Sequence, residues 1–508
     1  MHRIPALLAC ALLAACAVNP VTGDRDLILV SGQQELAMGA QNYAPLTQSQ
    51  GGVYDVDPAL NAYVRTVGER LAAVSDADLP YEFVIINNSV PNAWALPGGK
   101  IGINRGLLTE MQSEAELAAV LGHEIVHAAA RHSAQQMSRG MLLQGLVVAT
   151  SVATNDSSYG NLAVGGAGVA AQLLSTRYGR GAELESDKYG MRYMSRAGYD
   201  PQGAVELQKT FVRLSEGRNQ DWLSGLFASH PPSQERVQAN IETAAKLPPG
   251  GELGVERYRM ALKQTRDAMP AYEAYDKGRK ALAEKKNDEA LALAEEAIEK
   301  FPAEAHFHAF RGDVRLMNKQ YDMAVTNYDR AISRRGDFFY YHLQRGIAKH
   351  ELGQDDAAAA DLERSIELLP TAPAHYTLGR IEARRGNRAA AIEHFKVVAA
   401  AGGEYGKAAS AELVRLDLAS NPADYIPRRC DAGRNGNLVV SVKNETSVPV
   451  RGVRVAVDYT DSLGRAQSRV LGVGGRLAPG EIASVDTGMG PYQGGNCPAR
   501  VVAAEVAD

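Results

Sequence analysis

The alternation of apolar and polar residues predicts three helices early in the chain. Apolar side chains recur at helical spacing after Ser31, Pro58 and Ser113. Ser31 and Ser113 are followed three residues later by Gln34 and Glu116, which is the capping-box pattern of a helix start. Pro58 suits the first turn of a helix, because the N–H group that proline lacks is unpaired there anyway. We therefore expect a mainly α first domain.

The helix that follows Ser113 is apolar on nearly every side, so we expect it to be buried and to continue through Ser133. Upstream of it, β-forming residues predict strands at 81–87, 92–96 and 100–104, and the dipeptide Gly98-Gly99 lies in the turn between the last two. The first domain is thus predicted to combine a buried helix with a small β-sheet.

A repeat of 34 residues follows. Gly278, Gly312 and Gly346 are spaced by 34 residues, and Gly379 follows after 33. Each glycine is followed by an alanine twelve residues later and, in three of the four units, by a bulky residue four positions further on. This pattern resembles the tetratricopeptide (TPR) helix-turn-helix repeat. We expect an α-solenoid of about four TPR repeats over residues 270–415, whose concave surface binds a peptide or protein.

The last part, residues 421–508, changes in character. It is rich in Val, Gly and Thr, and the segments 438–442, 450–458 and 468–473 alternate as strands do. The prediction is a small β-sandwich. Its sequence contains no constellation of residues that indicates catalysis.

Composition excludes several classes of protein. With 508 residues the chain has room for about three domains. Lys and Arg number 54 and Asp and Glu 59, and the resulting formal charge of -5 argues against a nucleic-acid-binding protein. Hydrophobic residues make up 45% and charged residues 22%, as in ordinary globular proteins. No segment reaches the roughly 18 apolar residues of a membrane-spanning helix.

The amino terminus has the pattern of an export signal. Arg3 precedes an apolar stretch that ends in Leu13-Ala14-Ala15-Cys16. This ending resembles a bacterial lipobox, which implies that residues 1–15 are removed and Cys16 is diacylated; two acyl chains suffice for stable membrane attachment. Ala17 after the cysteine favours, by resemblance to Gram-negative sorting signals, the periplasmic side of the outer membrane. The alternative is a plain signal peptide that happens to contain cysteine.

The chain contains only four cysteines, and export decides the state of each. Cys10 leaves with the signal and Cys16 carries the lipid. Cys430 and Cys497 remain, and in an oxidising compartment we expect them to form a disulfide.

The sequence His123-Glu124-Ile125-Val126-His127 is an HExxH motif on the buried helix. Residues four apart project from one face of a helix, so both imidazoles can bind one metal ion. Zn²⁺ suits imidazole nitrogen and takes three protein ligands in hydrolytic sites. Glu124 is turned away from the ligand pair and is expected to act as the general base toward the attacking water. The alternative, two satisfied core histidines, is weaker because an apolar helix then buries two polar groups without a reason.

The third zinc ligand is expected downstream. The metzincin pattern fails, because Ala130 and Ser133 stand where it needs Gly and His. Glu183 and Asp187 are four apart on a predicted helix, which suits a carboxylate ligand and a carboxylate that orients a ligand histidine. Glu185 is expected to face solvent. Without the HExxH motif, this cluster would be interpreted as a charged surface. The prediction is one Zn²⁺ per chain, bound by His123, His127 and Glu183.

With HExxH and a Glu-x-x-Ser-Asp sequence 60 residues after His123, the chain resembles metallopeptidase family forty-eight, the gluzincins that include HtpX and the CAAX prenyl proteases. Further segments resemble the soluble periplasmic BepA-like branch, in which TPR repeats follow the peptidase domain. They are Asn19-Pro20-Val21-Thr22-Gly23, the strand-turn segment 92–99 and Ser229-His230-Pro231-Pro232. Ser186 is a mild departure, because the family usually has Ala there. The family does not include the carboxy-terminal β-region.

The resemblance implies two further roles near the zinc. The strand segment lies beside the active site, where its edge could pair with an extended substrate; its residues are Asn92, Ala93, Trp94 and Ala95. His230 lies close to the zinc in the family. It either occupies the open position on the metal and restrains the enzyme, or donates a hydrogen bond to the tetrahedral intermediate. A surface histidine beside a Pro-Pro turn is the remaining alternative.

The resulting division is a signal peptide at 1–15, a zinc metallopeptidase domain at 16–265, TPR repeats at 270–415 and a β-sandwich at 421–508. The family resemblance implies a lipid-anchored periplasmic endopeptidase. It degrades misfolded or stalled envelope and outer-membrane proteins, and its repeats recruit substrate or the outer-membrane assembly machinery. A chaperone or scaffold with little proteolysis is the alternative. The apolar segments 141–154 and 160–176 form either a lid or membrane-facing hairpin, or two packed helices.

Overall fold

The structure is a computed structural model that describes residues 16–144, 178–217, 230–460 and 465–507. The chain forms two compact units. The first comprises residues 1–352 with 367–369, and the second comprises 353–366 with 370–508. The predicted class is confirmed: the chain is mainly helical, with a small sheet near its start, helical repeats and a strand-rich carboxy-terminal region.

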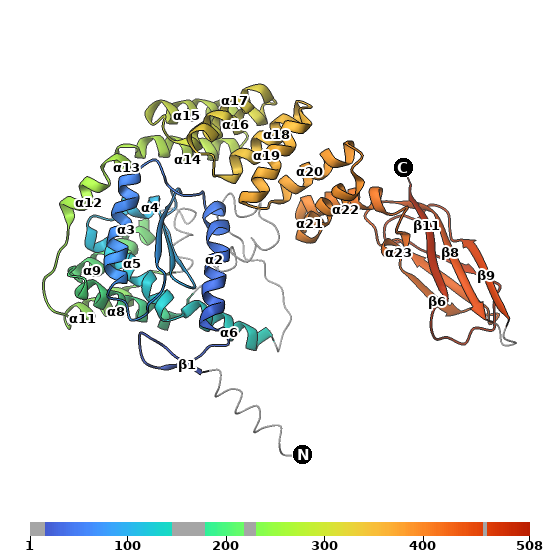
Figure 1. Ribbon diagram of the computed structural model, residues 1–508, viewed down its shortest axis with the longest axis horizontal. Coiled ribbons are helices and arrows are strands. Elements are labelled where there is room, and N and C mark those ends of the chain that lie inside the picture. The colour runs from blue at the N-terminus through green and yellow to red at the C-terminus, as the bar shows by residue number, and fades with distance from the viewer. Residues whose placement is uncertain (1–15, 145–177, 218–229, 461–464, 508) are drawn as a thin grey trace, which may run out of the picture. The chain divides into compact units, whose positions relative to one another are not determined.

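Helices make up most of the first part of the first unit (Figure 1). Ser31 and Ser113 cap the predicted helices, each accepting a hydrogen bond from the backbone N–H three residues on, and Pro58 is the first residue of its helix. The three predicted helix starts are therefore confirmed. In chain order the helices are α2 (Gly32–Ser49), α3 (Pro58–Ala72), α4 (Arg105–Glu110), α5 (Glu114–Ala129), α6 (His132–Gln144), α8 (Arg180–Arg196), α9 (Gln202–Gly217), α11 (Gln234–Ala244), α12 (Val255–Ala261) and α13 (Lys263–Asp267).

The three predicted strands form one sheet, in the order β3-β5-β4. They are β3 (Glu82–Ile86), β4 (Ala93–Leu96) and β5 (Lys100–Asn104), with β3 parallel and β4 antiparallel to β5. Residues 53 and 54 pair with the outer side of β3, so β4 forms the open edge among the described residues. Two further short strands, β1 (Cys16–Val18) and β2 (Arg25–Leu27), pair with each other.

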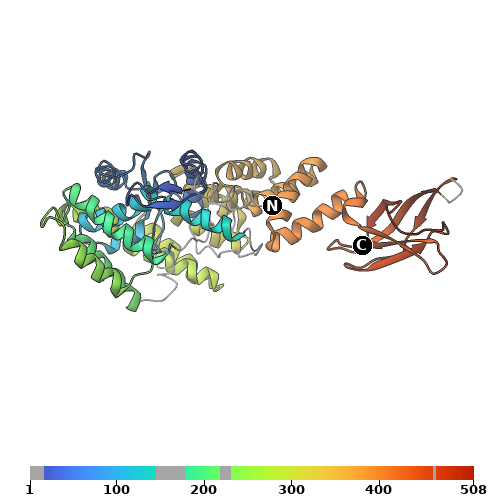
Figure 2. The ribbon, with the colours of Figure 1, turned by 90° about the horizontal axis from the view of Figure 1, so that it is seen from below.

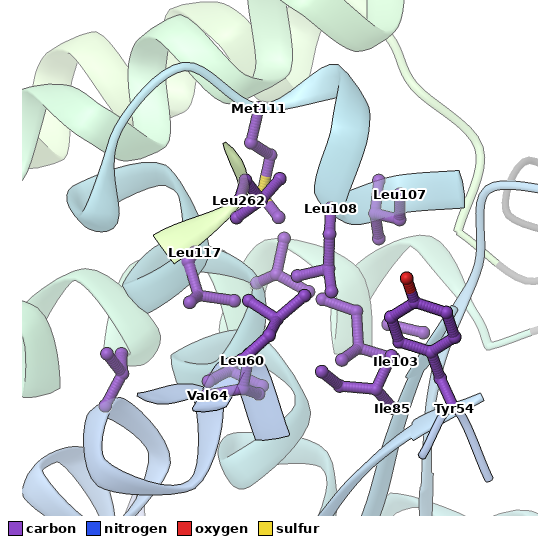
Figure 3. Close-up of a cluster of buried hydrophobic side chains, with 14 of the residues drawn as sticks. Tyr54, Leu60, Val64, Ile85, Ile103, Leu107, Leu108, Met111, Leu117 and Leu262 are labelled. Carbon is purple, nitrogen blue, oxygen red and sulfur yellow. The ribbon is translucent and has the colours of Figure 1, made fainter. Parts of the chain in front are cut away.

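The core of this region lies between the sheet and the helices that pack around it (Figure 3). Leu60 and Val64 come from α3, Leu108 from α4 and Leu117 from α5, and all are almost completely buried. Burying one such side chain contributes about 1.5–3 kcal/mol, so this cluster provides the rigid support on which α5 rests.

The buried helix ends earlier than its apolar pattern predicts. α5 stops at Ala129, and α6 begins at His132. Arg131 adopts a left-handed conformation with φ of 61°, which a helix cannot continue through. Its guanidinium group is held by Glu35 and by the carbonyl oxygen of Val30, which lies 2.9 Å from Nη2. The prediction of one helix through Ser133 was wrong because these distant partners stabilise the break.

The TPR helices begin in the first unit with α14 (Met269–Ala283), α15 (Asn287–Lys300), α16 (Ala305–Met317), α17 (Tyr321–Arg334) and α18 (Phe339–Glu351). In two of the repeats, the glycine lies against the bulky residue sixteen positions later. A Cβ atom at Gly312 would lie 2.7 Å from the Tyr328 ring, and one at Gly379 2.9 Å from the Phe395 ring. These contacts explain why the repeat needs glycine: a side chain would push the paired helices apart.

The second unit contains the remaining repeat helices and the strands (Figures 1 and 2). The strands form two three-stranded sheets, β10-β7-β6 and β11-β8-β9, as predicted for a small sandwich. A disulfide joins Cys430 and Cys497. The elements are α19 (Asp355–Leu368), α20 (Ala372–Arg384), α21 (Arg388–Ala401), α22 (Gly403–Asp417), α23 (Pro422–Tyr425), β6 (Arg428–Ala432), β7 (Leu438–Lys443), β8 (Val450–Thr460), β9 (Ala466–Gly472), β10 (Ile482–Asp486) and β11 (Ala499–Val506).

Two predictions fall outside the described residues. The first concerns the signal segment 1–15. The second concerns the apolar segments 141–154 and 160–176, of which only residues 141–144, the last turn of α6, are described. Within the described ranges, no helix is both long and apolar enough to cross a membrane.

Candidate metal centre

Helix α5 presents His123 and His127 from one face. Every residue of this helix is buried, as its apolar sequence predicts. The four-residue spacing places the two imidazoles one turn apart, and their Nε2 atoms lie 3.0 Å from each other. Two nitrogen lone pairs therefore converge on one point inside the protein.

Two glycines let α8 lie directly against α5. A Cβ atom at Gly190 of α8 would lie 2.9 Å from the backbone nitrogen of His123, and one at Gly122 would lie 3.1 Å from the carbonyl oxygen of Gly190. Side chains at these positions would force the helices apart. The close approach brings Glu183 and Asp187, one turn apart on α8, beside the two histidines.

Glu183 and His230 complete a group of four donors. The carboxylate oxygens of Glu183 lie 3.4 Å from His127 Nε2 and 3.6 Å from His123 Nε2. His230 Nδ1 lies 2.9 Å from Glu183 Oε1 and 3.3 Å from His123 Nε2. One ligand atom from each residue lies within 4.8 Å of the others, and all four residues are buried.

The loop of His230 is held by the start of α11. Pro231 and Pro232 follow the histidine and prevent a helix there, and Ser233 caps α11 by accepting a hydrogen bond from the N–H of Arg236. The imidazole of His230 is thereby placed between Glu183 and Glu124, whose Oε1 lies 3.7 Å from Nε2.

The outer nitrogen of His123 is held by a buried ion pair. Its Nδ1–H donates to Asp187 Oδ1 at 2.9 Å. Arg236 binds both oxygens of Asp187, each at 2.7 Å. Arg236 Nη1 also lies 2.9 Å from Glu183 Oε2, without hydrogen-bond geometry. These contacts keep the proton of His123 on Nδ1 and turn the lone pair of Nε2 inward.

The outer nitrogen of His127 contacts another histidine. His127 Nδ1 lies 2.9 Å from His132 Nδ1, and His132 Nε2 lies 3.4 Å from Glu185 Oε1. The expectation that Glu185 faces solvent was wrong, because its side chain is only 25% exposed and is also bound by Asn19. The ring of Tyr178 stacks on His127 with centroids 4.0 Å apart.

The electrostatics of the group follow from burial and close opposite charges. Burial alone would raise the pKa of Glu183, but the charge of His230 and the ring nitrogens of His127 and His230 beside its carboxylate hold this pKa far below its usual range. Burial lowers the pKa of His127 well below its usual value, although Glu183 opposes the shift. Burial raises the pKa of Glu124, with His230 and His123 acting against it. His127 is therefore neutral and Glu183 ionised.

These residues fit a metal ion. Imidazole nitrogen and carboxylate oxygen are the donors that zinc takes in hydrolytic sites. The inner nitrogens of His123 and His127 face each other at 3.0 Å, and a cation between them would satisfy both lone pairs. Glu124 Oε2 is buried and lacks a hydrogen-bond partner among the described residues, so it is available beside the donor group.

A cavity of about 30 Å³ lies next to His123, Glu124 and His230. A water molecule needs about 10–15 Å³, so the space suits a short side chain. Its other walls are mostly apolar and come from β4, α4, α5, α8 and α9; they include Ala93, Leu107, Val120, Met191, Leu207 and Phe211.

The predicted substrate strand lies beside this cavity. β4 contains Ala93, Trp94 and Ala95, and Asn92 immediately precedes it. Trp94 packs in a cluster with Leu46 of α2, whereas Ala93 lines the cavity. The open edge of the sheet and the donor group are thus neighbours.

Two residues of the centre were not found from the sequence. Arg236 is the third residue of α11, where the positive end of the helix dipole disfavours a cation. An arginine in a first turn is therefore a usable signal that a carboxylate holds it. His132 gave no signal, because its approach to His127 depends on the break at Arg131.

The other predicted site residues lie elsewhere. Cys16 is the first described residue and begins β1, where its backbone pairs with Leu27. Cys430 and Cys497 belong to the second unit, at the disulfide.

Comparison with known proteins places this arrangement in a family. A model described as Peptidase family M48 matches residues 58–244, and a tetratricopeptide repeat model matches residues 275–338. The beta-barrel assembly-enhancing protease of Yersinia pestis is 29% identical over 257 residues, covering 49% of this chain and 52% of that protein. The chain spans about half the length of the first curated relatives it matches, 51% and 52%.

Two further proteins match parts of the chain. The first TPR of Spaghetti (RPAP3), solved with an HSP90 peptide, is 23% identical and covers 24% of this chain and 96% of that one, with a TM-score of 0.23. Metalloprotease YcaL of Escherichia coli is 31% identical over 180 residues, covering 34% of this chain and 67% of that protein. The predicted family resemblance is confirmed. The YcaL match and the family model, which runs from α3 to α11, show that this chain belongs to peptidase family M48.

Proposed function

We propose that the chain is a zinc-dependent endopeptidase that binds one Zn²⁺ through His123, His127 and Glu183. The observation that carries the proposal is the buried group of four donors, which has Glu124 beside it. Without a metal ion, the buried Nε2 lone pairs of His123 and His127 face each other at 3.0 Å, which is costly. Binding a metal ion removes that cost.

Zinc at this position would act as a Lewis acid and bring the pKa of water toward about 7. The protein supplies the proton transfers. Glu124 accepts the proton of the attacking water and returns it to the nitrogen of the leaving amine. The free oxygen of Glu124, Oε2, is available to accept the proton of the water. Burial raises the pKa of Glu124, which favours the protonated form that then donates to the leaving amine. Asp187 and Arg236 hold His123 in place throughout.

Substrate recognition is assigned to the edge of β4. An extended peptide that pairs with this strand is recognised through its backbone, so many sequences are accepted. The pairing brings the peptide past Ala93 to the cavity beside Glu124. The cavity then receives one short apolar side chain next to the bond that is cut.

The proposed setting is the periplasmic side of the outer membrane of a Gram-negative bacterium, with a lipid on Cys16 as the anchor. The clients are misfolded or stalled envelope proteins, and the TPR repeats recruit them or the outer-membrane assembly machinery. The name of the Yersinia pestis relative, a beta-barrel assembly-enhancing protease, supports this assignment. We keep 16–265, 270–415 and 421–508 as the proposed domains.

His230 is proposed to restrain the enzyme. Its Nδ1 points at the donor group, 3.3 Å from His123 Nε2, so the imidazole can occupy the fourth position on the metal. His230→Ala should then raise basal cleavage, including self-cleavage, and expose the zinc to chelators. A fall in turnover of about 10²–10³-fold with zinc retained would instead identify His230 as a donor to the tetrahedral intermediate.

The central test measures zinc by elemental analysis and the cleavage of an unfolded protein by gel electrophoresis. Wild type should contain one zinc per chain, and Glu124→Gln should keep the zinc but lose turnover by about 10²–10⁴-fold, because an amide cannot accept the proton. Equal turnover by the two proteins would refute the mechanism. Zinc binding without cleavage by either protein would favour the scaffold function.

The anchor is tested separately by fractionation. Cys16→Ser should move the protein from the membrane pellet to the soluble fraction. If the variant stays in the pellet after a salt wash, the lipid on Cys16 is not the attachment.

A further inference from the structure

The turn between β1 and β2 reaches the surroundings of the metal centre through one side chain. Asn19 is 2% exposed, and its side-chain oxygen Oδ1 accepts from the backbone N–H groups of Val21 and Thr22 at 2.9 and 3.3 Å. Its amide donates to Asp26 Oδ2 at 3.1 Å and to Glu185 Oε1 at 3.2 Å. The contacts with Val21, Thr22 and Asp26 stabilise the turn itself. The contact with Glu185 joins the turn to α8.

Glu185 and His132 continue this contact to His127. Glu185 Oε1 lies 3.4 Å from His132 Nε2, and His132 Nδ1 lies 2.9 Å from His127 Nδ1. Ser186 Oγ, at 3.5 Å from His132 Nδ1, makes a longer contact with the same ring. We call Asn19, Glu185 and His132 the outer relay.

The hydrogen-bond roles in the relay follow from its chemistry. A carboxylate only accepts, so His132 presents its N–H at Nε2 toward Glu185. With that proton on Nε2, the Nδ1 of His132 is left to accept the hydrogen bond from His127 Nδ1–H at 2.9 Å. The Nε2 lone pair of His127 therefore points inward, at the donor group. The reverse tautomer would put a proton where the metal ion binds.

A second contact with the amino-terminal segment places His132. The helix break at Arg131 lets His132 begin α6 and turn back toward His127. That break is held by Val30 and Glu35, which bind the Arg131 guanidinium group. Residues 19–35 thus support His132 both through the relay and through the break.

We infer that Asn19, Glu185 and His132 are positioning residues that keep His127 in the tautomer that binds metal, so the segment next to Cys16 contributes to zinc affinity. The inference rests on the proposed zinc site. The arrangement parallels that of the other histidine ligand, His123, whose Nδ1 contacts the carboxylate of Asp187 directly at 2.9 Å. His127 reaches its carboxylate through one additional imidazole.

The experiment compares zinc dissociation constants by competition with a chelator. Glu185→Ala should weaken zinc binding by about 10–100-fold, as loss of such an outer partner does, and Asn19→Ala should weaken it less. Glu185→Gln keeps an acceptor oxygen for His132 and should restore much of the affinity. Thr22→Ala is the matched control, because in the described residues its hydroxyl accepts only from the N–H of Asp24, in the same turn.

A readout on the metal-free protein separates this inference from the proposed function. ¹⁵N NMR of the imidazoles should show His127 protonated at Nδ1 in wild type and a mixture of tautomers in Glu185→Ala. At saturating zinc, Glu185→Ala should recover most of kcat, because Glu124 is untouched. Wild-type affinity together with an unchanged tautomer in Glu185→Ala would overturn the inference. A wild-type protein that bound no zinc would instead refute the proposed function.

Discussion

Buried histidines occur in two regions of the first unit, and their partners differ. In α16, the two nitrogens of His306 both have hydrogen-bond partners: Nε2 donates to the carbonyl oxygen of Gly51 at 2.9 Å, and Nδ1 accepts from the hydroxyl of Tyr341. In the metal centre, the inner nitrogens of His123 and His127 face each other at 3.0 Å. Burial therefore does not distinguish a site from a core. What distinguishes the site is that the lone pairs of two imidazole nitrogens converge where no hydrogen-bond donor of the described residues lies between them.

The two regions also differ in how neighbouring charges change the pKa of a buried histidine. Burial lowers the pKa of His306 to about 4, although Glu304 opposes the shift, so this ring is neutral and structural. At the metal centre, Glu183 and Glu124 reverse the effect of burial on His230 and raise its pKa. In the first region the buried histidine stays neutral although Glu304 lies close to it, whereas the second region concentrates carboxylates and is ready for a cation.

The strongest test of this contrast exchanges one histidine from each region for alanine. His127→Ala should lose zinc severely, because a ligand is gone, whereas His306→Ala should keep it. His306→Ala should instead lose about 1–3 kcal/mol of stability for each buried group left without a partner. Elemental analysis and urea unfolding measure the two effects. Loss of zinc in His306→Ala would remove the distinction between the regions.

The next largest effect is expected at Arg236. Arg236→Met leaves Asp187 and Glu183 buried without their cation, and breaking a buried ion pair costs about 3–5 kcal/mol. The loss should be greater in metal-free protein than in zinc-loaded protein, because zinc supplies a compensating charge. Arg180→Met is the matched control: its pair with Glu235 is largely exposed, at 77% and 44%, and should matter by less than about 1 kcal/mol. Equal effects of the two variants would contradict the role of burial.

The smallest effect concerns the pH dependence of His306. Its pKa falls from 6.5 in the unfolded chain to about 4 in the folded protein. Below pH 6.5 the unfolded state therefore binds a proton that the folded state does not, so stability is lost as pH falls toward 4. The full loss is about 3 kcal/mol. His306→Gln should lack this component in urea unfolding between pH 7 and pH 4. Parallel pH profiles for the two proteins would show that His306 does not carry it.

Local signals in the sequence were sufficient for much of the fold. Helix starts followed from Ser31 and Ser113, because a capping interaction spans only three residues. The repeat followed from glycine spacing, since Gly312 and Tyr328 must touch within one helical pair. The end of α5 could not be predicted, because Arg131 is held by residues about one hundred positions earlier, with sequence separations of 96 and 101.

The residues of the metal centre also fall into those that could be predicted from local sequence and those that could not. His123, His127, Glu183 and Asp187 followed from helical spacing, which sets which side chains share a face. The outer partners did not, because Arg236 and Glu185 act through contacts between separate helices. Glu185 resembles a solvent-exposed residue in a charged run until the position of His132 is known.

The glycine contact between α5 and α8 has a consequence for how the chain tolerates mutation. Gly122 and Gly190 lie where two backbones meet, so even the methyl group of alanine has no free volume there. Most core positions accept a change of volume by shifting neighbouring side chains, but a backbone neighbour cannot rotate away. In a saturation mutagenesis scan selected for zinc-dependent activity, these two positions should therefore be among the least permissive in the chain, although neither has a side chain.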